Sequence, residues 1–454
     1  MDLRRARRGI VLATLATMFV GACGGGSTAP STEASVPTTA APSDAPTEAP
    51  ATAEAVTLTY LVDDTQATQD RAQGLIDAYT ALNPNVTIEV ETRPGGADGD
   101  NIVKTRLATG EMTDIFWYNS GSLLQALNPS ETLVDLSAEP FIANIVESYL
   151  PTVSQGDGIY GVPSETAMGG GILYNKKVYA DLGLSVPKSW EEFAANNVAI
   201  KAAGIAPIGA TYKDTWTSQL FVLADYYNVQ AEIPTFAEDY TANKVKYATT
   251  PAAMTGFTRL QDAFENGWYQ EDFGAATFDD GLNMLAEGTI AHYPMLTFAL
   301  GTIAENHPDA INDIGFFGQP GDDPAKNGAT IWMPAGTYIA NTSENIDAAK
   351  AFLAFIASVE GTEALTAAVA PSGPYVIKGS ELPEDALPGV LDIQTYLDSG
   401  ANSPALEFLS PVKGPSLEQI TVAVGSGLNT AEEGAALYDQ DVEKQAKQLG
   451  LPGW

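Results

Sequence analysis

Aromatic rings beside amide and carboxylate groups are the residues of this chain whose types and spacing could bind a small polar molecule. Trp117, Tyr118 and Asn119 stand in a row at the end of a short apolar stretch that is typical of a strand. Small molecules bind outside the carboxyl ends of parallel strands, where the loops leave a crevice. Successive side chains of a strand point to opposite faces, so one of the two rings is expected to face the core. The segment therefore predicts an aromatic and an amide contact, with the choice between Trp117 and Tyr118 left open.

Catalytic and metal-binding patterns are weak by comparison. His292 and His307, interpreted as turn or surface residues, are far in sequence from Cys23, the one cysteine, so no zinc site of His and Cys ligands is predicted. Neither a Gly-x-Ser-x-Gly elbow nor a phosphate-binding Gly-x-x-x-x-Gly-Lys-Ser/Thr loop occurs. Residues 95–101 resemble a calcium loop only in composition, because the distal glutamate is missing, and are interpreted as a surface loop. We therefore expect no metal and no cofactor, although the many carboxylates leave a glycosidase pair open.

The charge balance of the chain narrows the range of partners. Its 454 residues carry 57 Asp and Glu against 22 Lys and Arg, a net charge of −35. Such a surface repels phosphate backbones, so a nucleic-acid partner is not expected. With a single cysteine the chain has no internal disulfide, and its stability must come from packing of the core.

The N-terminus has the layout of a secretory signal. Four arginines between residues 4 and 8 precede an apolar run over 9–20 and the sequence Val-Gly-Ala-Cys, which ends at Cys23. This ending resembles a bacterial lipobox, in which cleavage leaves a lipid-bearing cysteine as the first mature residue. We predict a lipoprotein signal peptide over 1–22 and lipidation at Cys23, with an ordinary cleaved signal as the alternative. Residues 23–55 lack aromatic residues and are rich in Ala, Pro, Thr and Ser, which predicts a disordered linker that carries the lipid anchor.

The elements that would position the candidate residues begin at Val56. Strands are predicted over 56–62, 86–91 and 114–118, with helices over 70–82 and 102–108 between them. This alternation is typical of an α/β domain with a mostly parallel sheet. Helices predominate from residue 188 onward. They are predicted over 190–204, 218–227, 251–266, 278–287, 346–358 and, in pieces, 415–450. The pattern predicts an α/β lobe joined to a more helical one.

The order of several motifs resembles a known family. DGIYGVP over 157–163, ILYNK over 172–176 and LGLSVPKSWEEF over 182–193 follow one another with the spacing of extracellular solute-binding proteins of ABC importers. The resemblance is to the branch that binds sugars and oligosaccharides, the maltose-binding-protein-like family. Further matches lie at 107–116, 284–291 and 346–356, so the resemblance spans nearly the whole chain from Val56. Ser189 replaces the usual threonine and can cap the following helix equally well.

The resemblance implies an α/β, two-lobe periplasmic-binding-protein-like fold of type II. Each lobe would hold a mixed or parallel sheet flanked by helices, hinged by two to three crossings near 165–171, 295–301 and 341–346. The first lobe would comprise residues 56–167 and 300–341, and the second would comprise 168–299 and 342–454.

The resemblance also places a ligand site in the cleft between the lobes. A sugar offers hydroxyls for hydrogen bonds and C–H faces that pack on aromatic rings, so Trp, Tyr, Asp, Glu and Asn are the expected contacts. Asp63 and Asp64 end the first strand, where helix capping is the alternative role. The full set of predicted ligand-binding residues is Asp63, Asp64, Trp117, Tyr118, Asn119, Glu165, Trp216, Tyr293, Phe298 and Trp332.

The expected function is that of a substrate-binding lipoprotein of an ABC transporter. It would capture a sugar or oligosaccharide and deliver it to the membrane permease, with no bond made or broken. We expect a monomer held by its lipid on the extracellular face of the cell membrane, of the Gram-positive type. The alternatives are a secreted glycoside hydrolase or other glycan-active enzyme, and a purely structural surface lipoprotein.

Overall fold

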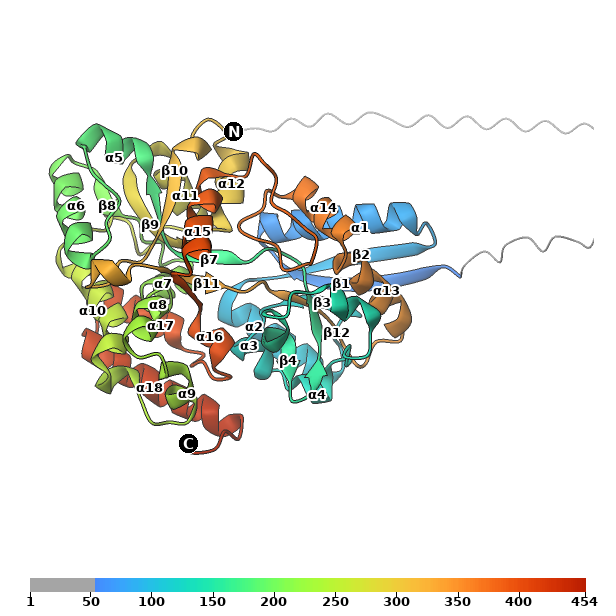
Figure 1. The fold of residues 1–454 in the computed structure, drawn as a ribbon. Coiled ribbons are helices and arrows are strands. Elements are labelled where there is room, and N and C mark those ends of the chain that lie inside the picture. The colour runs from blue at the N-terminus through green and yellow to red at the C-terminus, as the bar shows by residue number, and fades with distance from the viewer. Residues whose placement is uncertain (1–53) are drawn as a thin grey trace, which may run out of the picture. The chain divides into compact units, whose positions relative to one another are not determined.

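Two large β-sheets organise residues 54–454, the part of the chain that this computed structural model describes (Figure 1), and β4 (Ser154–Gln155) and β5 (Gly158–Ile159) form a third, two-stranded one. The predicted signal peptide, the lipidation site at Cys23 and the linker up to residue 53 lie outside the described residues. Each large sheet is flanked by helices and forms the core of one lobe, as the sequence predicts.

The first sheet has the strand order β2-β1-β3-β12-β6. Its first three strands run parallel, and β12 pairs antiparallel with both β3 and β6. The parallel arrangement brings the carboxyl ends of β1 and β3 to one edge of the sheet. The strands are β1 (Val56–Asp63), β2 (Val86–Arg93), β3 (Ile115–Tyr118), β6 (Gly161–Pro163) and β12 (Gly336–Ile339).

Helices from two separate parts of the chain cover the first sheet and complete what we call the first lobe. They are α1 (Gln66–Leu82), α2 (Gly96–Thr109), α13 (Ile346–Ile356) and α14 (Val359–Ala368). The close crossing of α1 and α14 depends on Gly74, because an added Cβ there would lie 2.4 Å from the Cβ of Ala368. Tyr79 on α1 packs edge-on against Phe352 on α13, with ring centroids 5.0 Å apart.

The second sheet has the order β13-β11-β7-β9-β8, and β10 also pairs with β7. Every residue of β7 is buried, because this strand has partners on both sides and helices over its faces. The strands of this second lobe are β7 (Met168–Asn175), β8 (Ala206–Ile208), β9 (Ile290–Leu296), β10 (Ile314–Gly318), β11 (Ala329–Trp332) and β13 (Asn402–Pro404).

Helices are numerous in the second lobe, and the sequence predicts that they predominate from residue 188 onward. Asn175 and Ser189 begin two of them by accepting hydrogen bonds from the backbone N–H groups of Val178 and Glu192. The helices are α5 (Lys176–Leu182), α6 (Trp190–Ala202), α7 (Leu220–Leu223), α8 (Tyr226–Glu232), α9 (Phe236–Thr241), α10 (Pro251–Glu265), α11 (Phe278–Glu287), α12 (Ala299–Asn306), α15 (Pro388–Ser399), α16 (Leu406–Leu409), α17 (Leu417–Gly425) and α18 (Ala431–Gln448).

The predicted boundaries between the lobes differ from the observed sheets at two places. The sequence assigns 300–341 to the first lobe, but β10 and β11 pair with β7 in the second sheet, and only β12 joins the first. The sequence assigns 342–454 to the second lobe, but α13 and α14 pack on α1 in the first. The predicted crossings at 295–301 and 341–346 are also wrong. At the first, the chain runs on into α12 and β10 of the second lobe, and at the second it runs from β12 into α13 within the first lobe.

Three segments connect the two sheets. Residues 164–167 lead from β6 to β7, and residues 333–335 lead from β11 to β12. The third follows α14, where the hydroxyls of Thr166 and Ser372 lie 2.8 Å apart. The three connections therefore lie side by side between the lobes.

Asp114 helps to hold α13 in the first lobe through hydrogen bonds. Its carboxylate accepts hydrogen bonds from the backbone N–H of Thr59 at 2.9 Å, the hydroxyl of Ser343 at 2.6 Å and the side-chain amide of Asn345 at 3.2 Å. Asn345 immediately precedes α13. The carboxylate thus ties the start of α13 to β1 and to the residue before β3.

No single helix between residues 54 and 454 is long and apolar enough to cross a membrane. The pair α13 and α14 meets that test only when taken together, and a 75° bend separates them.

Replacing Asp114 by alanine should lower the free energy of unfolding by about 1 kcal/mol, because the part-buried N–H of Thr59 loses its acceptor. Burial raises the pKa of Asp114, but the hydrogen bonds from Ser343, Thr59 and Asn345 outweigh it, so the pKa lies below its usual value. The stabilisation is therefore present above the unfolded pKa of about 4 and lost as the pH falls through the folded pKa. Urea unfolding followed by circular dichroism should show the difference from the parent shrinking between about pH 7 and about pH 3. Ser343→Ala, the matched control, removes one donor and should cost less, and a pH-independent difference for Asp114→Ala would contradict this account.

Candidate functional site

A cavity of about 490 Å³ lies between the two lobes and is lined by residues of both. This volume is within the range of roughly 300–1,000 Å³ that is usual for small-molecule sites. The first-lobe wall begins where the parallel strands end, with Asp63 at the end of β1 and Asn119 just after β3. The second-lobe wall comes from β7, β9 and β11, from residues 216–223, and from the segment that contains α16 and the start of α17.

The first-lobe wall is mainly polar. The Asp63 carboxylate accepts hydrogen bonds from the N–H and hydroxyl of Thr65, at 3.0 and 2.6 Å, and so holds the turn into α1. Asp100, on the second turn of α2, lies on the same wall. Burial raises the pKa of Asp100, and the charges of Lys104 and Arg93 offset this only in part. This wall therefore presents carboxylates that can accept hydrogen bonds.

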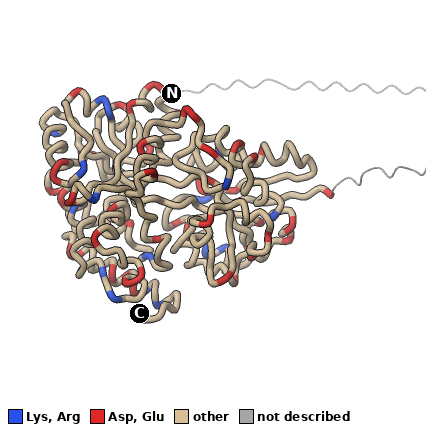
Figure 2. Tube along the Cα trace, in the orientation of Figure 1, with Lys and Arg blue, Asp and Glu red and all other residues tan. Residues whose placement is uncertain are grey.

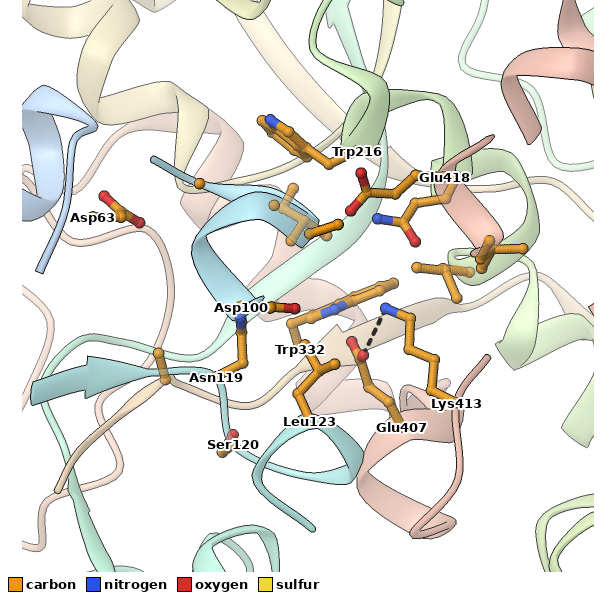
Figure 3. A pocket seen from close by; sticks show the side chains of 18 of the residues that line it. Asp63, Asp100, Asn119, Ser120, Leu123, Trp216, Trp332, Glu407, Lys413 and Glu418 are labelled. Atoms are coloured by element: carbon orange, nitrogen blue, oxygen red, sulfur yellow. Dashed lines mark hydrogen bonds and ion pairs between the residues drawn. The ribbon is translucent and has the colours of Figure 1, made fainter. Parts of the chain in front are cut away.

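The second-lobe wall is mainly aromatic and aliphatic. Trp216 packs on Phe298, with ring centroids 6.1 Å apart, and both line the cavity. Trp332, at the end of β11, packs closely against β7 at Gly170, since an added Cβ there would be 2.0 Å from its ring. In the view of Figure 3, Trp332 lies between Trp216 and the side chain of Glu407. The rings offer flat faces to a bound molecule.

Charged side chains of the second lobe interrupt this apolar wall at one end. Lys413 and Glu407 form an ion pair of 3.0 Å, and their side chains are 13% and 10% exposed (Figure 3). Glu418 accepts a hydrogen bond from the hydroxyl of Thr215 at 2.8 Å, and burial raises its pKa. Charged groups with so little solvent around them can form strong, directional hydrogen bonds with a bound molecule.

A buried ion pair lies where the crossings meet the cavity. Arg71 on α1 is 3.2 Å from Glu165, which lies on the first crossing. The other carboxylate oxygen of Glu165 accepts the backbone N–H of Ala335 on the second crossing, at 2.9 Å. Burial raises the pKa of Glu165, although the positive charge of Arg71 and the N–H of Ala335 act against it.

The two lobes also touch at the mouth of the cavity. Gly121 precedes α3 (Ser122–Gln125) in the first lobe and has φ of 70°, a conformation that favours glycine. An added Cβ there would lie 2.4 Å from the backbone oxygen of Glu407 in the second lobe. An added Cβ at Gly96 would likewise lie 3.6 Å from the Glu418 carboxylate. The two lobes therefore contact each other beside the cavity in this structure.

The structure brings seven of the ten predicted site residues to the cavity. They are Asp63, Trp117, Asn119, Glu165, Trp216, Phe298 and Trp332. Whether they contact a ligand stays a prediction.

The other three lie elsewhere, each for a physical reason. Asp64 follows the end of β1 and is exposed to solvent. Tyr118 has no exposed surface, because strand alternation turns it into the core while Trp117 faces the cavity. Tyr293 is buried in β9, where its hydroxyl lies 2.7 Å from that of Thr211.

Sequence reasoning missed two stretches of the cavity wall. Residues 95–101, interpreted as a surface loop, form the start of α2 and line the cavity with Gly95, Gly96 and Asp100. The paired glycines are the signal that could have indicated a close approach of backbone. The second stretch, 407–419, contains Glu407, Lys413 and Glu418.

The histidines have no part in the cavity. His292 lies buried in β9, not at a turn or on the surface, with its Nε2 atom 2.6 Å from the hydroxyl of Tyr179. Burial lowers its pKa to about 3, so the ring is neutral. His307 bonds to Asn283 near the surface. Within residues 54–454, no three His, Cys, Asp or Glu side chains gather as a metal site.

Comparisons with known proteins agree with this geometry. A curated relative, the multiple sugar-binding protein of Streptococcus mutans, is 23% identical over 265 residues, which cover 57% of this chain. The match spans 60% of the length of that protein, less than two thirds. Among solved structures, a chitin oligosaccharide binding protein superposes with a TM-score of 0.75 at 22% identity, covering 87% of this chain and 99% of that one. The complex of the solute-binding protein RafE with raffinose superposes with a TM-score of 0.69 at 21% identity, covering 87% and 99%.

The likeness to these solved structures confirms the predicted two-lobe fold of type II. Residues 64–363, more than half of the chain, match the family model described as bacterial extracellular solute-binding protein. The chain belongs to the family of bacterial extracellular solute-binding proteins.

Proposed function

We propose that this protein binds a sugar or an oligosaccharide in the cleft and delivers it to the permease of an ABC importer, with no bond made or broken. The observation that carries the proposal is that one cavity combines aromatic rings with carboxylates and an amide: most of the rings come from the second lobe, and the first lobe adds Trp117 beside Asp63 and Asn119. A pyranose ring has apolar C–H faces and a rim of hydroxyls, so it matches both walls at once. The names of the relatives, which bind multiple sugars, chitin oligosaccharides and raffinose, support the same class of ligand.

Each wall has its own part in binding. The rings of Trp216, Phe298 and Trp332 pack on the C–H faces of the sugar and release water from apolar surface. Asp63 and Asn119 on the first lobe accept and donate hydrogen bonds at the hydroxyls. Because most of the rings lie on the second lobe, the sugar binds there first, and the first lobe then closes over it with Trp117, Asp63 and Asn119.

Closure is a rotation about the three connections between the sheets. Hinge closure of this kind shifts a pre-existing equilibrium between open and closed forms by the difference in their affinities for the ligand. The closed form, with the contacts of Gly121 and Gly96 across the mouth, is the one we expect the permease to receive.

The N-terminal segment keeps the protein at the outer face of the cell membrane. A lipid on Cys23 anchors the chain, and residues 24–55 act as a tether for the body. The net charge of −35 repels anionic lipid headgroups, so the lipid, rather than the protein surface, holds the protein at the membrane. Asp and Glu are spread over both lobes, with Lys and Arg more sparse (Figure 2).

A panel of raffinose, chitin oligosaccharides and xylo-oligosaccharides tests the class of ligand. Binding to the folded state alone raises Tm, by roughly 3 °C for a protein of this size at about 100 times the dissociation constant. We expect a saturable rise with at least one member, measured by differential scanning calorimetry. Chromatography of the recovered sugar should show no product. Hydrolysis of the sugar, or no rise with any member, would contradict the proposal.

Trp216→Ala should weaken binding of the sugar that gives this rise. Loss of a central aromatic anchor costs about 2 kcal/mol, which is roughly a 30-fold rise in the dissociation constant by titration calorimetry. Trp454→Ala is the matched control, since Trp454 packs on Tyr240 away from the cavity. Equal affinities of the two variants would remove Trp216 from the site.

Cys23→Ala should release the protein from the cell. Without a lipid attachment point the chain has no anchor, so it should move from the membrane fraction to the medium. Cell fractionation with immunoblotting measures this distribution. Retention of the variant in the membrane fraction would show that something other than Cys23 holds the protein there.

A further inference from the structure

Arg93 is a buried cation directly behind the cavity wall. It is the last residue of β2, lies beside Asp63 of β1 in the sheet register, and is 3% exposed. Its guanidinium carbon is 5.7 Å from the ring centroid of Trp117 and 5.6 Å from that of Tyr118. Trp117 lines the cavity, whereas neither Arg93 nor Tyr118 does.

The hydrogen bonds of Arg93 do not explain its burial. One of its nitrogens, Nη1, donates to the backbone oxygen of Pro94 at 3.0 Å. Its Nε and Nη2 atoms have no hydrogen-bond partner among residues 54–454, and it forms no salt bridge with them. Burying an unpaired charge destabilises a fold, and an apolar side chain could fill the same space. What an arginine provides here, and an apolar side chain would not, is the cation that contacts the rings of Trp117 and Tyr118.

The surrounding backbone leaves room for the guanidinium. An added Cβ at Gly99, on the first turn of α2, would lie 2.4 Å from Nη1 of Arg93. Asp100 is the next residue of α2, and the positive charge of Arg93 acts to lower its pKa against the larger effect of burial. The end of β2, the start of α2 and the end of β3 thus enclose one cation.

Trp117 has no other polar contact to fix its ring. Its indole N–H is buried without a hydrogen-bond partner among the described residues. Its orientation at the cavity wall therefore depends on packing and on the attraction between its π-electrons and a cation.

We infer that Arg93 is a positioning residue of the cleft, which holds the Trp117 ring in the orientation that a ligand meets. The inference rests on the proposed function, because it is Trp117, and not Arg93, that would contact the ligand. The contact between Arg93 and Trp117 fixes the ring before the ligand binds, so less conformational freedom is lost on binding.

Nuclear magnetic resonance of the ligand-free full chain in detergent tests the positioning directly. The chain has six tryptophans, so its ¹H–¹⁵N spectrum holds six indole N–H signals, and Trp117→Phe identifies the one from Trp117. Arg93→Met should shift or broaden that signal and leave signals from distant tryptophans unchanged. Arg106→Met is the matched control, because Arg106 on α2 pairs with Glu91 at the surface, and it should move none of them. An unmoved Trp117 signal in Arg93→Met overturns the inference.

A double-mutant cycle with raffinose and a chitin oligosaccharide as probes then tests the effect on binding. Arg93→Met should weaken binding about fivefold in the parent, and by less than about twofold in a Trp117→Ala background. Arg93→Lys keeps the cation and should restore affinity to within about twofold of the parent. Equal losses in both backgrounds show that Arg93 does not act through Trp117 and overturn the inference.

The two proposals fail in different ways. If neither probe binds the parent protein, these sugars are excluded as ligands, while the indole spectrum still decides whether Arg93 positions Trp117. If Arg93→Met does not fold, Arg93→Gln takes its place, with the same outcomes for the Trp117 signal.

Discussion

One buried carboxylate links two of the connections between the lobes to the first helix of the first lobe. Glu165 lies on the first crossing, binds the backbone N–H of Ala335 on the second, and pairs with Arg71 on the first helix. Losing either member of a buried ion pair leaves an uncompensated charge, which typically costs about 3–5 kcal/mol. Glu165 therefore holds the first and second crossings together beside the cavity. The residues at the ends of the strands form the cavity walls on either side of it.

The two walls differ because the two sheets differ. In the first sheet three parallel strands end at one edge, and the residues just beyond them are free to be polar, as Asp63 and Asn119 are. In the second sheet the antiparallel β7 is buried along its whole length, and its neighbours bring large apolar side chains to the cavity. Gly170 is part of this arrangement, because only a residue without Cβ lets the Trp332 ring lie on the strand.

The sequence predicts the fold class and the family well because both depend on features that are local or ordered along the chain. The parallel strands of the first lobe and the helix over 278–287 follow from periodicity, and the motifs at 157–193 follow in order. The lobe boundaries after residue 300 are different. Whether the short apolar runs of β10, β11 and β12 join one sheet or the other depends on partner strands far away in sequence, which periodicity does not encode. For the site, the rule that ligands meet strand ends places Asp63, Trp117 and Asn119 at the cavity. Asp100, in a stretch interpreted as a surface loop, and Glu418, in a predicted helix, have no comparable signal in the sequence.

Tryptophan placement in this chain has an optical consequence. Trp117, Trp216 and Trp332 line the cavity, while the remaining three pack elsewhere in the second lobe. Indole emission responds to the polarity and the quenching groups around each ring. Half of the tryptophans of the protein therefore lie at the cleft, and a ligand that fills the cleft changes the surroundings of all three, so binding can be followed without an added label.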